Sequence, residues 1–498
     1  MKIAIGYPPM DSEKGIPLLS QNRQFQRFHN PTYIYPMVPA YAATMLENAG
    51  YEVIWLDGIA EKWSYQKWLE EVRKAEPDLI MMETKTPVVK RQWEIINMAK
   101  GEGRRAKWVL VGDHVTALPE ESFKNSKVDY VLTGGDYDFL LLNLANHLTK
   151  GEKLQPGIWY RTNEKIKNKN EKLQSKIENY SNTGKFQLNH DLNKLPFIDR
   201  DLTKWRLYAY ENGNYKRTPG TYIMAGRDCW HRINGGCSFC SWTTLFPAWR
   251  ARKPELVIDE IGFLIDSYGV QTVFDDTGTF IIGDQLKKFC GLMIKRGYNK
   301  KIDFSCNMRF GACSFNDYKL MKKAGFRMLL FGLESANQET LDKINKNLKV
   351  EQITDSCREA KKAGLEPHIT IMLGYPWESK EDALETVKLG KNLLRKGYAD
   401  TLQATLIVPY PGTALFKEAK EKGWLKTLNW DRYDMSEPVL KTKMKDSELK
   451  RLVQEIYKVA FDPEFIIRRL INIRSLDDVK FILMAGKKVL GHLRDFQK

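Results

Sequence analysis

The chain has 498 residues and a mass of 57.8 kDa, which predicts two or three domains and excludes a single ordinary one. Hydrophobic residues make up 43% and charged residues 28%, the mix of a soluble globular protein, and no apolar run approaches the roughly 20 residues that span a bilayer. The first residues lack a signal-peptide pattern, so we expect a cytoplasmic protein without a transmembrane segment. Seven cysteines are too few and too irregularly spaced for a disulfide framework.

The formal net charge is +16, from 78 Lys and Arg against 62 Asp and Glu. A solvated basic surface explains such a balance, and so would an anionic substrate, an acidic protein partner, a membrane surface or nucleic acid. Charge alone does not choose among them. We expect no nucleic-acid partner, because the aromatic and basic strand face typical of RNA binding is absent from the pattern.

Residues 1–150 alternate between predicted strands and helices. Strands are predicted at 2–6, 51–57, 78–84, 108–113 and 128–135, and helices at about 36–49, 65–75 and 88–101. This rhythm predicts a doubly wound parallel sheet, a Rossmann-like α/β domain whose ligand lies beyond the carboxyl ends of the strands. Residues 151–205 are predicted to be a linker, with an exposed polar insertion at 161–185 that is rich in Lys and Asn.

A second strand–helix series follows and defines a domain at 206–425. Its strands are predicted at 221–228, 270–276, 302–308, 327–334, 367–374 and 402–409, with helices at about 254–268, 284–296, 315–324, 351–363 and 380–395. Six parallel strands of this kind predict a partial (β/α)6 barrel with its chemistry at the strand carboxyl ends. The overall fold class is therefore α/β.

Residues 426–498 are predicted to form a C-terminal helical domain. Residues 440–498 hold 14 Lys and Arg against 8 Asp and Glu, a net charge of +6. Amphipathic segments such as FIIRRLINI favour a helical cap packed on the barrel, and a membrane-surface or partner helix is the alternative.

Three cysteines crowd into the segment after the first barrel strand. Cys229, Cys237 and Cys240 have the spacing C-x7-C-x2-C, and Gly235-Gly236 between them allows a tight turn. Thiolates are ligands for zinc or for an iron–sulfur cluster. A structural zinc site needs four protein ligands, and His231 lies too near Cys229 in the chain to share one ion with it easily. Three thiolates favour a [4Fe–4S] cluster with one iron left open for a small molecule.

The four remaining cysteines fall in predicted helix or strand interiors, where a small buried hydrophobe is expected. They are Cys290, Cys306, Cys313 and Cys357.

At this point the chain resembles the radical S-adenosylmethionine (SAM) enzymes, in particular those with an N-terminal cobalamin-binding domain. The segments that carry the resemblance are the three cysteines, FDDTGTF (274–280), FGLESANQETLDKINK (331–346), MLGYPWESKEDALET (372–386) and VPYPGTALFKEAKEKGWL (408–425). The family's usual spacing is C-x3-C-x2-C, so the x7 gap is a departure that leaves the number of ligands intact.

The resemblance implies a [4Fe–4S] cluster on Cys229, Cys237 and Cys240, with SAM bound to its open iron. It assigns SAM contacts at the strand ends, which are Asp275, Asp276, Asn307, Arg309, Glu334, Ser335, Gly374, Val408 and Tyr410. Asp275 and Asp276 have helix capping as an alternative role. The resemblance also implies a low-potential electron donor such as ferredoxin or flavodoxin. A cluster with an open iron is sensitive to oxygen, so we expect an anaerobic host. The basic C-terminal region favours an acidic or protein substrate.

The N-terminal domain is similar to a cobalamin-binding module. The cobalamin contacts expected from this similarity are Tyr7, Pro8, Thr84, Lys85, Thr86, Gly112, Asp113, His114, Gly134 and Gly135. The pattern D-x-H-x-x-G, whose His binds cobalt from below in many such domains, is absent, since His114 follows Asp113 directly. We therefore expect that no histidine of that motif binds the lower face, and an ordinary loop residue remains an alternative for His114.

Three functions are compatible with these features. The first is a cobalamin-dependent radical SAM methyltransferase that moves a methyl group from SAM, by way of methylcobalamin, to an unactivated carbon of a protein side chain, natural product or lipid. The second is a related radical SAM enzyme that closes a ring or forms another carbon–carbon bond. The third, a non-catalytic iron–sulfur or nucleic-acid-binding protein, leaves Glu334 and the Gly-Tyr-Pro segment without a role.

Overall fold

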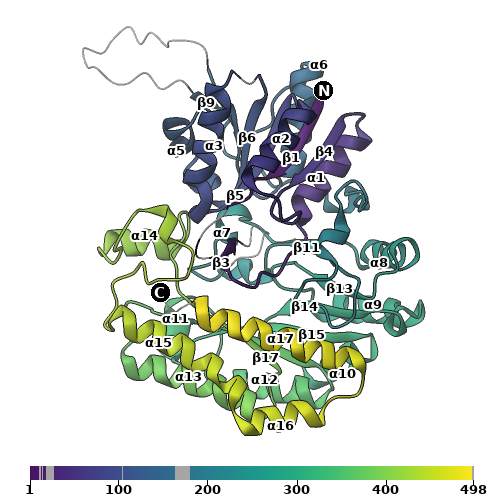
Figure 1. Cartoon of the computed structure of the whole chain (residues 1–498). Coiled ribbons are helices and arrows are strands. Elements are labelled where there is room, and N and C mark those ends of the chain that lie inside the picture. The colour runs from purple at the N-terminus through teal and green to yellow at the C-terminus, as the bar shows by residue number, and fades with distance from the viewer. Residues whose placement is uncertain (11–12, 14, 18–26, 104, 163–179, 496–498) are drawn as a thin grey trace.

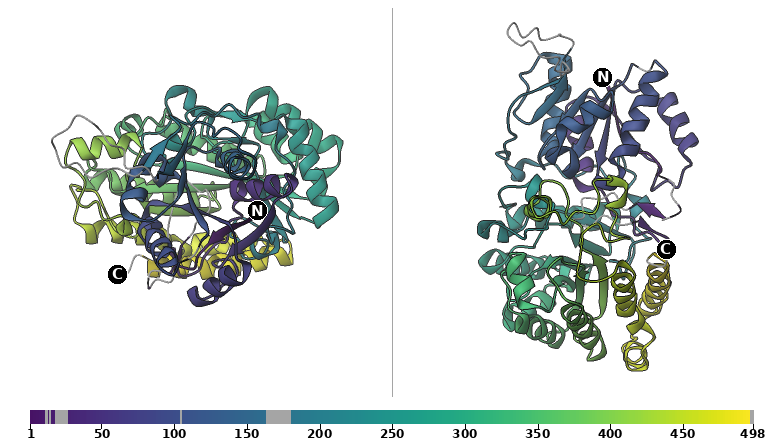
Figure 2. Two further views of the ribbon diagram at one scale, coloured as in Figure 1. Left: turned by 90° about the horizontal axis from the view of Figure 1, so that it is seen from above. Right: turned by 90° about the vertical axis from the view of Figure 1, so that its left-hand side faces the viewer.

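The computed structural model describes residues 1–10, 13, 15–17, 27–103, 105–162 and 180–495. Two α/β units are stacked one on the other, and the C-terminal helices lie along one side of the lower unit (Figures 1 and 2). The α/β fold class predicted from the sequence is confirmed. Most of the predicted insertion at 161–185 lies outside the described residues.

The upper unit is a seven-stranded sheet in the order β4-β1-β5-β6-β7-β8-β9. Its strands are β1 (Lys2–Tyr7), β4 (Glu52–Asp57), β5 (Leu79–Thr84), β6 (Lys107–Gly112), β7 (Tyr130–Leu132), β8 (Ile158–Arg161) and β9 (Tyr180–Asn182). The first five strands in this order are parallel, and β8 and β9 add antiparallel at one edge. Every residue of β5 is buried, as expected for a central strand covered by helices on both faces.

The helices of the upper unit follow the predicted rhythm. They are α1 (Met37–Asn48), α2 (Tyr65–Ala75), α3 (Val89–Gly101), α4 (Asp113–Ala117), α5 (Pro119–Asn125) and α6 (Tyr137–Lys150). The sheet continues past residue 150 into the segment predicted as linker, because β8 pairs with β7. A short antiparallel edge strand has too few residues for a clear periodicity, so the sequence does not reveal it.

The lower unit is a six-stranded parallel sheet whose spatial order equals its chain order. Its strands are β10 (Gly220–Ile223), β13 (Thr272–Asp275), β14 (Asp303–Met308), β15 (Phe326–Glu334), β16 (Glu366–Leu373) and β17 (Thr401–Leu406). The helices between them are α8 (Pro254–Tyr268), α9 (Gly283–Lys295), α10 (Phe315–Lys323), α11 (Gln338–Lys343), α12 (Val350–Lys362) and α13 (Lys380–Arg395). This is the predicted partial barrel, open between β10 and β17.

The C-terminal region is helical, as predicted. Its helices are α15 (Asp446–Tyr457), α16 (Pro463–Ile471) and α17 (Leu476–Asp495), and α14 (Ala414–Glu421) precedes them at the end of the segment predicted as barrel. The Tyr457 hydroxyl on α15 accepts from the Ala404 backbone N–H and donates to its carbonyl, which fastens α15 to the edge strand β17. The helices therefore cap the open side of the barrel.

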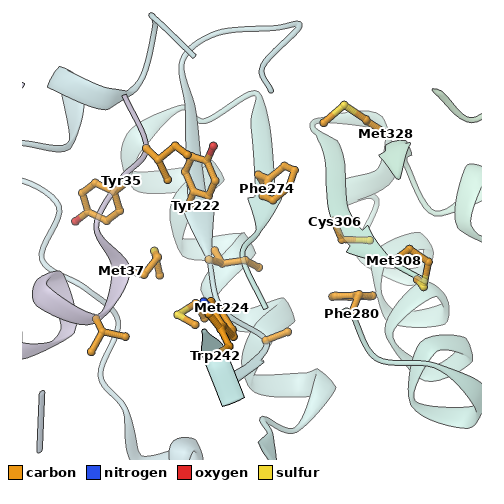
Figure 3. Close-up of a cluster of buried hydrophobic side chains, with 14 of the residues drawn as sticks. Tyr35, Met37, Tyr222, Met224, Trp242, Phe274, Phe280, Cys306, Met308 and Met328 are labelled. Carbon is orange, nitrogen blue, oxygen red and sulfur yellow. The ribbon is translucent and has the colours of Figure 1, made fainter. Parts of the chain in front are cut away.

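One hydrophobic core runs through both units. Figure 3 shows Tyr35, two residues before α1, and Met37, its first residue, beside Tyr222 and Met224 from the first barrel strand and the loop after it. All four side chains are nearly inaccessible to solvent. Apolar burial across this boundary fixes the carboxyl edge of the upper sheet against the mouth of the barrel.

Candidate functional site

The cysteine loop leaves the barrel between two very short strands that pair antiparallel, β11 (Gly226–Arg227) and β12 (Arg250–Ala251). Cys229 begins a single 3-10 turn, and Gly235 and Gly236 then reverse the chain at φ +83° and +72°. The positive φ of Gly236 favours glycine at this position, and a Cβ there would also displace the Arg232 guanidinium, 2.2 Å away. The seven residues between Cys229 and Cys237 thus form a compact turn.

A cavity of about 110 Å³ opens at the barrel mouth, and we call it the cysteine cavity. All three loop cysteines line it. Six of the residues predicted to contact SAM line it as well, which are Asp276, Asn307, Arg309, Glu334, Val408 and Tyr410. These side chains come from four different strand ends, and the fold brings them together around one space.

The cysteines fit the predicted cluster. Cys229, Cys237 and Cys240 form no disulfide and are of intermediate exposure. The Cys229 Sγ lies 2.8 Å from the Thr279 hydroxyl, and the Arg309 guanidinium donates to the Cys237 Sγ at 3.8 Å. In the described part of the chain no set of Cys, His, Asp and Glu converges as ligands of one metal ion, whereas a [4Fe–4S] cluster binds each thiolate through a different iron.

Glu334 offers an acceptor where SAM is expected. It ends β15 at φ +63°, an unusual conformation for a residue with a side chain, and its Oε1 accepts from the Lys346 Nζ at 2.7 Å. Its Oε2 is buried and has no hydrogen-bond partner among the described residues. Arg309 donates to the Lys346 carbonyl, so one network positions the carboxylate and the guanidinium. An orphaned buried acceptor facing this cavity suits the hydroxyl groups of a nucleoside.

Three other predicted SAM residues do not line this cavity. The Asp275 carboxylate accepts from the backbone N–H groups of Ala225 and Thr277, and burial raises its pKa to about 7. The Ser335 hydroxyl donates to Glu378 at 2.7 Å, and a Cβ on Gly374 would point toward α15. The SAM contacts of Asp275, Ser335 and Gly374 stay predictions. The contacts that these residues make within the protein give each of them a structural role.

The predicted cobalamin contacts lie at the carboxyl edge of the upper sheet. The Tyr7 hydroxyl donates to Glu83 Oε2 at 2.6 Å, and Lys85 Nζ lies 3.7 Å from Glu83 Oε1 and 3.8 Å from Asp113 Oδ2. Burial raises the pKa of Glu83 although Lys85 and Tyr7 oppose the shift. The buried Thr84 hydroxyl has no partner among the described residues, which leaves a hydrogen-bonding group available at this edge.

His114 is fully buried in α4. Its Nδ1 lies 3.2 Å from the Thr86 hydroxyl and its Nε2 lies 3.4 Å from a Glu121 carboxylate oxygen, with the Trp430 ring packed edge-on at 5.3 Å. Both ring nitrogens therefore face protein groups. A role for His114 in binding cobalamin stays a prediction.

Close packing surrounds the remaining predicted cobalamin positions. A Cβ on Gly112 would lie 2.3 Å from the Thr84 carbonyl oxygen, and Cβ atoms on Gly134 and Gly135 would overlap the rings of Phe186 and Phe246. Pro8 follows Tyr7 and is buried. Their cobalamin contacts also stay predictions.

A buried ion-pair cluster joins the two units beside the cysteine loop. Arg227 donates to Asp136 Oδ1 at 2.7 Å and to both carboxylate oxygens of Asp138, and Arg250 and His190 also contact Asp136. Burial alone would raise the pKa of Asp136, but Arg227, His190 and Arg250 together hold it well below its usual range. The carboxyl edge of the upper sheet is thus tied directly to the strand that leads into Cys229.

The sequence analysis missed several residues of this site. Lys346, Thr279 and Arg232 position the cavity groups, and Arg232 does so through an ion pair with Asp228. Thr279 and Lys346 lie within the segments 274–280 and 331–346 that carry the family resemblance, but their roles follow only from partners that the fold brings near. Arg232 meets Asp228 through the turn of the loop. The prediction for the other cysteines is confirmed for Cys290, Cys306 and Cys357, which are fully buried, whereas Cys313 is partly exposed.

The fold and the site define an α/β enzyme of two cofactor domains, and comparison with known proteins agrees. The sequence matches the B12 binding domain over residues 31–139 and the Radical SAM superfamily over residues 226–390. It is 28% identical over 428 residues to the uncharacterized methyltransferase PH0819 of Pyrococcus horikoshii, covering 85% of this chain and 86% of that protein. It is 25% identical to the anaerobic magnesium-protoporphyrin IX monomethyl ester cyclase of Cereibacter sphaeroides, covering 82% of this chain and 64% of the cyclase.

Two solved structures share the fold. The radical SAM methyltransferase TsrM from Kitasatospora setae superposes with a TM-score of 0.62 at 16% identity, over 84% of this chain and 75% of TsrM. The cobalamin-dependent SAM radical enzyme OxsB superposes with a TM-score of 0.68 at 12% identity, over 99% of this chain and 71% of OxsB.

The chain carries a B12-binding domain over residues 31–139 and a radical SAM domain over residues 226–390. Its cofactors are those of the two domains, which are a [4Fe–4S] cluster, SAM and cobalamin. None of the helices in the described part of the chain combines the length and the apolar composition needed to cross a membrane.

Proposed function

We propose that this protein is a radical SAM C-methyltransferase that uses cobalamin to methylate an unactivated carbon. The observation that carries the proposal is the convergence of three cysteines, Arg309 and Glu334 on one cavity that reaches the boundary with the B12-binding domain. Val408 and Tyr410, which line this cavity, also pack in the hydrophobic core cluster of the upper unit. A group bound in the cavity would therefore lie beside the B12-binding domain, which supports the proposal.

The chain's own residues hold and orient the reactants. Cys229, Cys237 and Cys240 would hold the cluster, and Glu334 and Arg309 would hold the ribose and the carboxylate of SAM. When bound, these cofactors supply reductive cleavage of SAM and a carrier for its methyl group, and the protein supplies binding, orientation and exclusion of water. Lys346 fixes the rotamer of Glu334 through their 2.7 Å contact. Both side chains are nearly buried, so bulk water has little access to the group they bind.

The test is anaerobic reconstitution of the full chain with iron, sulfide and hydroxocobalamin, followed by incubation with SAM and a low-potential reductant. A methyltransferase of this type consumes SAM in two ways and forms both S-adenosylhomocysteine and 5′-deoxyadenosine. We expect about four irons and one cobalt per chain and both products. A variant with Cys229, Cys237 and Cys240 changed to Ala should retain cobalt and form no 5′-deoxyadenosine. Absence of iron from the wild type would overturn the proposal.

A matched pair of variants tests the role of Glu334. Glu334→Gln should retain iron and cobalt and weaken SAM binding by tenfold or more, because a neutral amide replaces a buried carboxylate acceptor. Glu339→Gln makes the same change on an exposed side chain of α11 and should leave SAM binding unchanged. Equal SAM affinity in the two variants would remove Glu334 from the proposed site.

The second candidate is a radical SAM enzyme that closes a ring or forms another carbon–carbon bond. The similarity to the magnesium-protoporphyrin ester cyclase favours it. Such an enzyme would form 5′-deoxyadenosine without S-adenosylhomocysteine, so the ratio of the two products separates the candidates.

A further inference from the structure

A second and larger cavity, of about 320 Å³, lies between the open edge of the barrel and helices α16 and α17. We call it the apolar cavity because most of its lining is aliphatic or aromatic. Representative lining residues are Leu402, Phe465, Leu470, Phe481 and Ala485. Voids much larger than a water molecule are rare in well-packed interiors, and this volume falls in the range of roughly 300–1,000 Å³ typical of ligand pockets.

The two cavities are neighbouring parts of one barrel interior. Ile34, Asn214, Leu330 and Gln403 line both of them. Alternate residues of a strand share one face, and along β16 His368 lines the apolar cavity while Thr370 and Met372 line the cysteine cavity. A ligand in the apolar cavity therefore lies on the same inward face as the cofactor-binding groups.

Two polar groups in the apolar cavity have unused hydrogen-bonding capacity. The buried Nε2 of His368 has no partner among the described residues, while its Nδ1 contacts the Thr401 hydroxyl at 2.8 Å. Lys488 on α17 donates to the Pro31 carbonyl and to the Thr32 hydroxyl, which uses two of its three donors. In the described part of the chain Lys488 has no carboxylate at ion-pair distance, whereas Arg469 lies 3.2 Å from Asp400.

We propose that the apolar cavity binds the hydrocarbon part of an anionic amphiphilic substrate, whose reactive carbon extends past Leu330 and Gln403 into the cysteine cavity. The apolar lining selects a hydrocarbon group because its burial is favourable in proportion to the area removed from water. Lys488 selects a carboxylate or phosphate, since a partly buried ammonium without a carboxylate partner favours an anion. The reaction of this amphiphile rests on the proposed methyltransferase function, whereas its binding in the apolar cavity does not.

The test measures binding without turnover. Equilibrium dialysis of ¹⁴C-laurate against the reconstituted full chain requires no optical signal, so the colour of the cofactors does not interfere. We expect saturable binding at one site in the micromolar range, and butyrate, which has the same head group and a short chain, should not compete. A wild type that binds no laurate, or that binds butyrate equally well, would overturn the inference.

A matched pair of variants on α17 locates the site. Ala485→Trp fills the apolar cavity and should weaken laurate binding by tenfold or more. Leu483→Trp introduces the same ring on an exposed position of the same helix, 70% accessible, and should bind as the wild type does. Both variants should melt at the wild-type temperature. Equal laurate binding by the two folded variants would contradict the assignment.

The result of the laurate-binding test can be distinguished from the result of the methyltransferase test. Ala485→Trp should retain iron, cobalt and SAM binding, because Ala485 lies outside the cysteine cavity. Laurate binding that is lost in Ala485→Trp supports the cavity assignment even if the wild type forms no S-adenosylhomocysteine. Formation of that product by a wild type that binds no laurate would overturn the cavity assignment and leave the proposed function intact.

Discussion

Removing the Arg227 guanidinium tests how the two units are held together. Arg227 is 1% exposed, and in Arg227→Met the carboxylate of Asp138, also fully buried, loses its charged partner. Asp136 keeps Arg250 and His190. Breaking a buried ion pair from one side costs about 3–5 kcal/mol, because the partner's charge stays desolvated without compensation.

The assay is urea-induced unfolding followed by circular dichroism, with the free energy taken from the first transition. We expect Arg227→Met to lose about 3–5 kcal/mol, and Arg217→Met, which breaks a partly exposed pair 3.7 Å from Asp303, to lose at most about 1 kcal/mol. Adding Asp138→Asn to Arg227→Met should restore part of the loss, since it removes the unpaired charge. A loss below about 1 kcal/mol in Arg227→Met would refute the reasoning.

Three further predictions concern local packing and ionisation. Gly112 has φ +117°, and in Gly112→Ala the new Cβ would lie 2.3 Å from the Thr84 carbonyl oxygen. This change should lower the free energy of unfolding in urea by about 1–3 kcal/mol. The control Gly101→Ala, with open space around its Cβ, should be neutral or stabilising. The folded-state pKa of Asp275, about 7, lies above its unfolded value, so the free energy of unfolding should fall as pH rises from about 4 to 7. Asp275→Asn should flatten this pH dependence. An unchanged pH dependence in the variant would show that another group titrates. Iodoacetamide should label the three loop cysteines of the metal-free protein well before Cys306, because burial raises the pKa of the Cys306 thiol. Peptide mass spectrometry measures the order of labelling. Labelling of Cys306 before the loop cysteines would contradict the burial argument.

The sequence determined the elements that have a clear periodicity. Helices α2, α8 and α13 begin and end at the predicted residues, since an apolar stripe of period 3.6 with a cap or glycine at its end defines a helix locally. The grouping of Cys229, Cys237 and Cys240 around one cavity was predictable too, because it depends on proximity along the chain, while their role as cluster ligands stays a prediction. The two-residue strands β11 and β12 were not, since pairing across more than twenty residues leaves no local pattern.

Only the tertiary structure decided which polar side chains face one another. Lys346 meets Glu334, Arg227 meets Asp138, and His368 lines the apolar cavity, although nothing in the local sequence assigns these partners. For helices α16 and α17 the sequence favours a cap on the barrel and leaves a membrane-surface helix as the alternative, and the structure packs them beside the open barrel. The physical reason is that periodicity records which face of an element is buried, whereas the partner of that face is chosen by the packing of the whole chain.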